Sequence, residues 1–412
     1  MILNRNIKDK LEKALSFNPV VLLTGARQTG KSTLMAAIAQ EHNYSVYTFD
    51  SLTTLAAATN DPSGFIASIQ KPAVLDEVQR IPEIFLPIKH VVDQDRQPGL
   101  FALTGSANPL LVPRLGDSLA GRISILELFP LSQGELIGIF DDFIDLAFGE
   151  KYPIITSISK KELVEKMMIG GYPNVQSVDE EQQDHWFDNY ITTVLKREIT
   201  ELAKIEGIVE FPQLLRLLAT RAGTILNVSE LSRASMLVNT TLRRYLALLQ
   251  TVFMIYFLPS WGVNLSKRLV KSPKVYLVDT GLLSHLLGIN HDRLSVDSAL
   301  TGNLFENFVV MELKKQASWS KRCVNLYYYR TLDGTEVDIV IEDKAGAIVG
   351  LEVKASETIT PADFKGLKHM QEMYKNRFLK GIILYAGSES IPFGRNLLPG
   401  LLHLCGQKLF ER

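Results

Sequence analysis

The stretch VVLLTGARQTGKSTLMAAIAQEH, residues 20–42, determines the fold expected for the amino-terminal part of the chain. Residues 20–25 form an apolar run typical of a buried strand, and residues 32–42 carry apolar side chains at helical spacing. Between them, GARQTGKS at residues 25–32 matches the pattern G-x-x-x-x-G-K-[ST]. The pattern therefore lies on a glycine-rich turn that joins a strand to a helix.

The turn at residues 25–32 has the chemistry of a phosphate-binding loop. Its glycines let backbone N–H groups face an anion, and the helix that follows adds the partial positive charge of its amino end. We expect Lys31 to bind the β and γ phosphates of ATP, and the Ser32 hydroxyl to bind Mg²⁺. An ordinary strand-to-helix turn is the alternative. The predicted nucleotide-binding residues are Gly25, Ala26, Arg27, Gln28, Thr29, Gly30, Lys31, Ser32 and Thr33.

Two acids end the next relevant apolar run, AVLDEVQ at residues 73–79. We expect Asp76 to hold Mg²⁺ through its water shell, because this cation prefers oxygen ligands beside the phosphates. Glu77 is the predicted residue that polarises the attacking water. The alternative is a strand that ends in two solvated acids.

A third apolar run ends in LTGSAN, residues 103–108. A hydroxyl at this point, from Ser106 or Thr104, is predicted to contact the γ phosphate. Arg122, in SLAGR, is a further candidate, because an arginine can stabilise transition-state charge from the same chain or from a neighbouring subunit. Structural ion pairing is the alternative for Arg122.

Polar residues near the other end of the chain suggest a second site. Asp338 lies in the predicted strand EVDIVIED, while Glu352 and Lys354, two positions apart in LEVKAS, leave one face of the next strand. With Glu306 on a predicted helix, this is the layout of restriction-endonuclease-like nucleases, in which carboxylates hold Mg²⁺ and a lysine orients or activates water. Val337 stands where many such nucleases have proline. The alternatives are a solvated E-x-K strand and a retained fold that only binds DNA.

The charge of the chain is balanced overall but uneven locally. There are 44 lysines and arginines against 45 acids, so a nucleic-acid site must be a local patch. Residues 211–280 hold nine basic residues against two acids, over a helix–helix–strand pattern typical of a winged helix-turn-helix. A winged helix that binds a protein is the alternative. The residues predicted to contact DNA are Arg243, Arg244, Lys267 and Arg268.

Other features of the composition exclude several classes of protein. Cys323 and Cys405 form no C-x-x-C or Cys/His group, which argues against a zinc finger and a disulfide scaffold. The chain does not open with a secretory signal, and the apolar stretch 245–258 is too short to cross a bilayer of about 30 Å as a helix. We therefore expect a soluble cytoplasmic protein without membrane association.

The ordered motifs GARQTGKS, VLDEVQ, LTGSAN and SLAGR resemble those of prokaryotic AAA+ ATPases, in particular the archaeal-ATPase-like branch fused to a carboxyl-terminal domain of unknown function. The later stretches resemble that partner domain: GGYP (170–173), the region around YITTVLKREITEL (190–202), KVYLVDTGL (274–282), GNLFENFV (302–309), GTEVDIV (334–340) and LEVKAS (351–356). The resemblance implies an ATPase that forms homo-oligomers, with a ring as one arrangement. It supplies no substrate.

The expected fold class is α/β, with four predicted segments. These are an AAA+ P-loop ATPase domain (1–140), a helical linker or lid (141–210), a winged helix-turn-helix (211–265) and a mixed restriction-endonuclease-like α/β domain (266–412). The leading hypothesis is a Mg²⁺-dependent ATPase whose carboxyl-terminal half binds DNA. The alternatives are an ATP-dependent metal nuclease, and a nucleotide-dependent switch or chaperone-like ATPase with a protein partner.

Overall fold

The computed structural model describes residues 3–107, 119–149, 159–200, 210–290, 293–294, 297–387 and 397–401. Its contacts group the chain into two compact units. The first unit comprises residues 1–130, 196–205 and 246–254, and the second comprises 131–195, 206–245 and 255–412. The first long segment of the first unit ends at Pro130. The predicted linker and winged-helix segments do not form units of their own.

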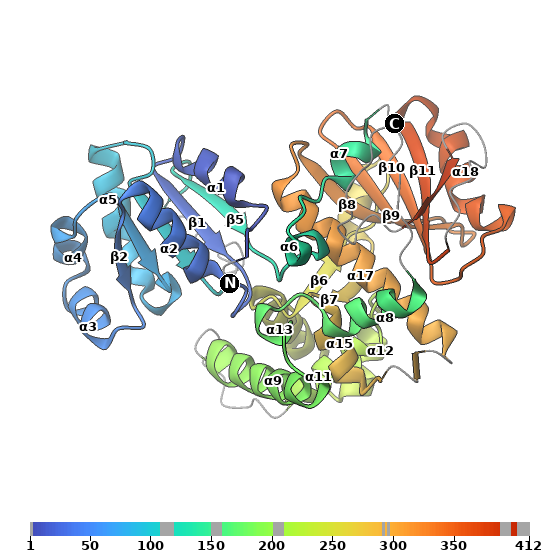
Figure 1. Ribbon diagram of the computed structural model, residues 1–412, viewed down its shortest axis with the longest axis horizontal. Helices are drawn as coiled ribbons and strands as arrows, with labels where there is room; N and C mark the ends of the chain where they lie inside the picture. Colours follow the sequence, from blue (N-terminus) through green and yellow to red (C-terminus); the bar gives the residue numbers. More distant parts are fainter. Residues whose placement is uncertain are drawn as a thin grey trace. The chain divides into compact units, whose positions relative to one another are not determined.

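The first unit contains a parallel sheet of five strands in the order β2-β3-β4-β1-β5 (Figure 1). The sheet confirms the α/β class expected from the alternation of apolar runs and helical stretches. Its strands are β1 (Val20–Thr24), β2 (Ser45–Thr48), β3 (Ala73–Asp76), β4 (Phe101–Gly105) and β5 (Ile123–Glu127).

Helices cover both faces of this sheet because its central strands are apolar on both sides. On one face, Val21 and Leu23 pack with α1 (Lys8–Leu15) and α2 (Lys31–His42). On the other face, Val20 and Leu22 pack with buried residues of three further helices. These helices are α3 (Leu52–Asn60), α4 (Pro62–Ser68) and α5 (Phe85–Gln94).

The second unit begins with helices. They are α6 (Gln133–Ile137), α7 (Phe143–Ala147), α8 (Lys160–Ile169), α9 (Glu180–Thr193), α11 (Glu210–Ala219), α12 (Val228–Ser235) and α13 (Asn239–Thr251), the last of which crosses the unit boundary after residue 245. An antiparallel pair follows, formed by β6 (Ile255–Leu258) and β7 (Lys274–Leu277), with α14 (Leu265–Val270) between them. Helices followed by a strand pair are the element order expected for a winged helix, which stays a prediction.

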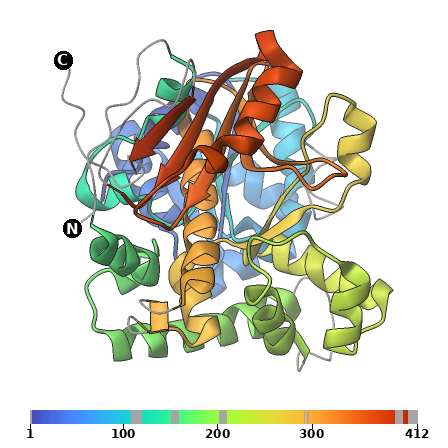
Figure 2. The same cartoon turned by 90° about the vertical axis from the view of Figure 1, so that its right-hand side faces the viewer.

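A mixed five-stranded sheet forms the carboxyl-terminal part of the second unit, in the order β12-β11-β10-β9-β8. Neighbours β8, β9 and β10 pair antiparallel, whereas β10, β11 and β12 pair parallel. The long helix α17 (Ser298–Trp319) lies against this sheet (Figure 2), and α18 (Lys365–Tyr374) also packs on it. The strands are β8 (Val324–Arg330), β9 (Glu336–Asp343), β10 (Ile348–Lys354), β11 (Phe378–Tyr385) and β12 (Leu397–Leu401).

The GGYP and VDTGL stretches meet inside the second unit, where Asp279 joins them. Its buried carboxylate accepts hydrogen bonds from the Gly171 N–H at 2.7 Å and from the Leu282 N–H at 3.1 Å, where it caps helix α15 (Thr280–Leu287). Gly170 has φ +73°, and a Cβ there would lie 2.2 Å from the Asp279 carboxylate. Asp279 and the two glycines of GGYP therefore stabilise the packing of these two stretches.

Within the ranges that the structure describes, no helix is both long enough and apolar enough to cross a membrane.

Candidate functional site

The phosphate-loop motif and the two polar strand ends gather at one edge of the first sheet. Because β4 pairs with both β1 and β3 in parallel, the carboxyl ends of these three strands lie side by side. The loop after β1 requires glycine at Gly25, where a Cβ would lie 2.1 Å from the Leu128 carbonyl oxygen. Gly30, at φ +92°, then leads directly into α2.

Lys31 is buried, with 4% of its surface exposed, and its ammonium is held by the loop itself. Nζ donates to the carbonyl oxygens of Gly25 at 2.9 Å and Ala26 at 2.7 Å. Burial lowers the pKa of Lys31 to about 8, although the negative charges of Glu77 and Glu198 oppose this shift. A lysine with this pKa binds phosphate only in its protonated form.

This shift predicts that nucleotide affinity falls above pH 8. Because bound phosphates favour the charged ammonium, the complex must take up a proton whenever free Lys31 is neutral. The dissociation constant for ATP should rise by up to about tenfold per pH unit between pH 8 and the higher pKa of the complex. Titrations from pH 7 to 10 measure this, and Lys31→Ala, which lacks the titrating ammonium, should show no measurable binding at any pH in this range. A flat profile for the unaltered protein would contradict the assignment.

Oxygen ligands suitable for Mg²⁺ lie beside the loop. The Ser32 hydroxyl donates to Asp76 Oδ1 at 2.9 Å, and the Thr48 hydroxyl donates to Asp76 Oδ2 at 3.3 Å. Thr104 also donates to Asp76 through its hydroxyl. A hydroxyl and a carboxylate are oxygen donors of the kind that a hard cation prefers, so Ser32 and Asp76 would hold Mg²⁺ here, and the cation would offset phosphate charge.

Glu77 adopts a backbone conformation that is rare for residues with side chains. Its φ of +60° is left-handed, and its N–H donates to the Thr104 hydroxyl at 3.1 Å. Such a conformation costs on the order of 1–3 kcal/mol and persists where the surrounding structure enforces it. The Glu77 carboxylate accepts a hydrogen bond from Gln79 Nε2, which also donates to the Ser106 hydroxyl at 2.8 Å.

The structure places a further residue, Glu198, in this site. Its carboxylate accepts hydrogen bonds from Arg27 Nε and, at 2.8 Å, from the Ser106 hydroxyl. Burial lowers the pKa of Arg27, but the charge and hydrogen bond of Glu198 more than offset this, so the pKa is raised. Sequence reasoning missed Glu198 because it lies 171 positions from Arg27. Only tertiary structure brings the two together.

Arg122 lies at the amino ends of the parallel strands, whereas the phosphate loop lies at their carboxyl ends. It directly precedes β5, and its carbonyl accepts from the N–H of Val20, the first residue of β1. Its guanidinium pairs with Asp93 at 2.5 Å. A catalytic role within the same chain therefore does not fit this position, and ion pairing explains the residue.

The predicted carboxylates of the second unit meet where two strands separate. Pairing of β10 with β9 ends at Leu351 and Ile339, so Asp338 and Glu352 lie at the point of divergence. One carboxylate oxygen of Asp338 accepts from the Val353 N–H at 2.9 Å, in place of a ladder hydrogen bond. The Lys354 ammonium lies 3.5 Å from Glu352. Burial raises the pKa of Glu352 well above its usual range, and the charge of Asp338 raises it further.

Lys274 supplies a positive charge inside this carboxylate cluster. Its ammonium lies 2.9 Å from Glu306, 2.7 Å from Glu336 and 3.8 Å from Asp338, and its side chain is 4% exposed. Lys274 is one of the nine basic residues between 211 and 280, but because it is buried it is not part of a basic surface. Burial raises the pKa of Glu306 to about 7, with Asp338 acting in the same direction and Lys274 in the opposite one.

These contacts do not fit a metal site built from Glu306, Asp338 and Glu352. The Lys274 ammonium lies 2.9 Å from Glu306 Oε1 and 3.8 Å from Asp338 Oδ1, and the Tyr276 hydroxyl donates to the same Glu306 oxygen at 2.6 Å. A lysine and a divalent cation compete for the same carboxylates. The ammonium of Lys274 thus takes the place of a metal ion between Glu306 and Asp338.

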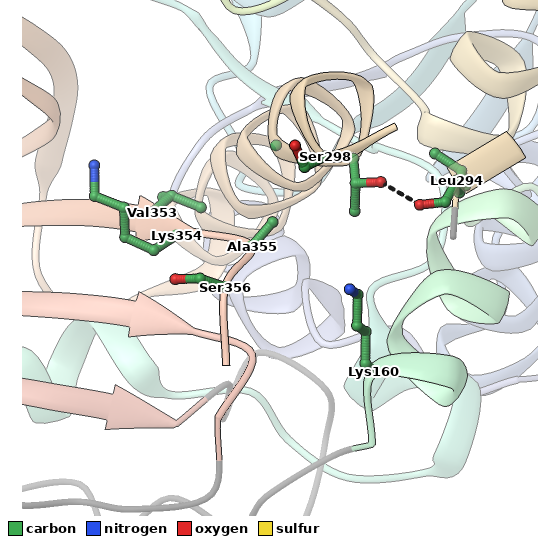
Figure 3. Close-up of a pocket in the computed structure, with 9 residues that line it drawn as sticks. Lys160, Leu294, Ser298, Val353, Lys354, Ala355 and Ser356 are labelled. Atoms are coloured by element: carbon green, nitrogen blue, oxygen red, sulfur yellow. Dashed lines mark hydrogen bonds between the residues drawn. The ribbon is translucent and has the colours of Figure 1, made fainter. Parts of the chain in front are cut away.

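A cavity of about 380 Å³ lies at the carboxyl end of β10 (Figure 3). Lys160 and Lys354 both line it, and the Lys160 ammonium points toward it. Thr301 donates its hydroxyl to the Leu294 carbonyl at 2.7 Å in the wall. The cavity therefore adjoins the β10 end, through Val353 and Lys354.

The four residues predicted to contact DNA are not equivalent. Arg243 and Arg244 are exposed on α13. Arg268 is 9% exposed, makes two hydrogen bonds to the Glu342 carboxylate and stacks on Trp261, so its guanidinium is not available to phosphate. We therefore leave Arg268 out of the basic surface. The Lys267 side chain lies outside the described residues.

Three family models match successive parts of the chain. The profile described as "AAA domain" matches residues 17–137. Profiles of two domains of unknown function follow, DUF8612 at residues 160–293 and DUF4143 at residues 301–401. Among solved structures, a Walker-type ATPase of Pyrococcus abyssi is 16% identical with a TM-score of 0.42, covering 69% of this chain and 96% of that one. AMPPCP-bound DnaA from Aquifex aeolicus is 15% identical with a TM-score of 0.27, covering 59% and 85%.

Uncharacterized proteins of Mycobacterium bovis and Mycobacterium tuberculosis are each 30% identical to this chain over 395 residues. The match covers 95% of this chain and 82% of theirs. An uncharacterized protein of Haemophilus influenzae is 24% identical over 289 residues, covering 68% of this chain and 65% of its own. The chain therefore belongs to the same family as the two mycobacterial proteins, and its residues 17–137, which contain the five-stranded parallel sheet, match the AAA domain.

Proposed function

We propose that the protein is a Mg²⁺-dependent ATPase whose second unit binds DNA. The observation that carries the ATPase part is the meeting of Lys31, Asp76 and Glu77 at the carboxyl edge of one parallel sheet. Ligands of α/β sheets bind at such edges.

Each residue of the site has a proposed role. Lys31 binds the β and γ phosphates after it exchanges the carbonyl oxygens of its own loop for phosphate oxygens. Ser32 and Asp76 hold Mg²⁺, which neutralises phosphate charge when bound. Glu77 accepts a hydrogen bond from the attacking water and thereby orients it. Ser106 contacts the γ phosphate, and Gln79 links it to Glu77.

Exposed arginines on the helices before β6 support the DNA part of the proposal. Arg216, Arg233, Arg243 and Arg244 are exposed on α11, α12 and α13. Neutralising a phosphate with such a side chain releases counterions, which gives an affinity that depends on salt. We therefore propose α13, with its adjacent arginine pair, as the principal DNA-contacting helix. DNA bound to the second unit is then expected to alter the ATPase rate.

Replacing Arg243 and Arg244 together by alanine is expected to weaken DNA binding at least about tenfold at moderate salt. The slope of log affinity against log salt should fall by about two, since two phosphate contacts are lost. Fluorescence anisotropy with duplex, single-stranded and branched DNA measures both quantities. The double variant Lys365→Ala/Lys368→Ala, which removes two exposed lysines from α18, is the control of equal charge change. Equal losses in both double variants would contradict the assignment to α13.

A protein partner is the second candidate, favoured by exposed apolar side chains in the turn between α12 and α13. Met236 is 90% exposed and Val238 66% exposed. ATP hydrolysis rates with and without the three kinds of DNA separate the candidates. A rate that changes with DNA supports the first proposal, and a rate that is the same with every DNA supports the second.

Metal-dependent DNA cleavage is not part of the proposal. Asp338, Glu352 and Lys354 do lie close together at the end of β10. However, Lys274 binds the carboxylates of Glu306 and Asp338 that a catalytic metal would need.

A further inference from the structure

Glu198 places a negative charge among groups that are suited to bind a phosphate. Its side chain is 3% exposed, and it binds the Arg27 guanidinium of the phosphate loop and the hydroxyl of Ser106. The negative charge of Glu198 also favours the protonated form of Lys31 and so raises the pKa of that lysine. A guanidinium, an ammonium and a hydroxyl around one oxyanion are the partners expected for a terminal phosphate.

The local backbone around Glu198 is unusual. Val194–Ile199 forms a π-helical turn directly after α9. Such turns are rare and occur frequently at functional sites. Residues 196–205 belong to the first unit, although the chain on both sides of them belongs to the second. Glu198 therefore lies in a turn that continues directly from the end of α9.

We propose that Glu198 occupies the γ-phosphate position in the nucleotide-free and ADP-bound protein, and that ATP displaces it. The inference rests on the proposed ATP site. Two anions cannot share Arg27 and Ser106 without strong repulsion, because both would lie in a poorly solvated place. ADP lacks the third phosphate and leaves the Glu198 contacts intact. Glu198 is thus a positioning residue that sets the preference between ATP and ADP, and it makes the π-helical turn responsive to the γ phosphate.

Nucleotide binding to the variant Glu198→Gln tests the preference. Glutamine keeps the shape of the side chain and removes its charge. Affinity for a non-hydrolysable ATP analogue is expected to increase about tenfold, because the competing anion is gone, while ADP affinity changes less than about threefold. Glu181→Gln, which removes an exposed acid from α9, should change neither affinity. Circular dichroism verifies that both variants are folded.

Hydrogen exchange in the unaltered protein tests the displacement itself. Peptides covering residues 194–200 are expected to exchange faster with the ATP analogue than with ADP or without nucleotide. In Glu198→Gln the same peptides should already exchange faster without nucleotide. A merely structural role of Glu198 would give no difference between the two nucleotides.

The outcomes separate this inference from the function on which it rests. If the unaltered protein binds neither nucleotide, the ATP site itself is wrong and the inference falls with it. If ATP binds but Glu198→Gln leaves the ratio of ATP to ADP affinity unchanged, and exchange at residues 194–200 is the same with both nucleotides, the role of Glu198 is wrong and the ATP site stands.

Discussion

Replacing Glu77 by glutamine is expected to lower the rate of ATP hydrolysis by at least about a hundredfold while ATP still binds. The amide keeps the shape of the side chain but is a weaker proton acceptor, so the attacking water loses the group that polarises it. Gln79 Nε2, which donates to the Glu77 carboxylate, can still bond to the amide oxygen. The geometry of the site should therefore survive. A phosphate-release assay and an equilibrium binding measurement on the same preparation give the two quantities.

Two further variants make the result on Glu77 specific. Lys31→Ala should remove measurable nucleotide binding, since it deletes the ammonium held at the centre of the loop. Glu83→Gln removes an exposed acid six positions after Glu77 and should hydrolyse ATP at the unaltered rate. Normal turnover by Glu77→Gln would show that another residue polarises the water.

The parts of this site that could be predicted from the sequence are those encoded in short stretches. The loop at residues 25–32, Asp76 and Ser106 each follow an apolar run, and each run forms a strand of one parallel sheet. Parallel strands have their carboxyl ends at the same edge, so the local patterns imply the convergence. The location of Arg122 could not be predicted in this way, because Arg122 precedes its strand and therefore lies at the amino ends of the parallel strands.

The residues that the sequence did not reveal act through partners distant in the chain. Glu198 lies in the stretch YITTVLKREITEL, but nothing in that stretch indicates a contact with the phosphate loop, and its partners Arg27 and Ser106 come from other elements. Lys274 and Arg268 were counted as surface charge because composition alone cannot show burial. In the structure both residues form ion pairs inside the second unit. Lys274 pairs with Glu306 and Glu336, and Arg268 pairs with Glu342.

Replacing Lys274 by methionine is expected to reduce the free energy of unfolding by about 3–5 kcal/mol. Methionine fills a similar volume but leaves Glu306, Glu336 and Asp338 without the ammonium that they share. Breaking a buried ion pair by removing one partner costs more than the pair itself contributes, because the remaining charge stays desolvated. Chemical denaturation measures the loss. Lys271→Met, at an exposed position three residues earlier, should change stability by less than about 0.5 kcal/mol.

The pH dependence of this loss follows from Glu306. Its pKa is already raised to about 7 in the presence of Lys274, and removal of the neighbouring positive charge raises it further. A carboxyl whose folded pKa exceeds its unfolded pKa destabilises the protein increasingly as pH rises toward the folded value. The difference in stability between Lys274→Met and the unaltered protein should therefore be larger at pH 8 than at pH 6. Adding Glu306→Gln to Lys274→Met should recover part of the loss at pH 8.

Mn²⁺ provides the sharpest test of Lys274 as the internal cation of the carboxylate cluster. In Lys274→Met the oxygens of Glu306 and Asp338 are no longer engaged by an ammonium, and carboxylates of this kind are ligands for a divalent metal. Millimolar Mn²⁺ without nucleotide should therefore raise the melting temperature of Lys274→Met more than that of the double variant Lys274→Met/Asp338→Asn, which lacks one carboxylate. If Mn²⁺ stabilises the unaltered protein as strongly as Lys274→Met, the ammonium does not exclude a metal, and cleavage of DNA by this cluster returns as a candidate activity.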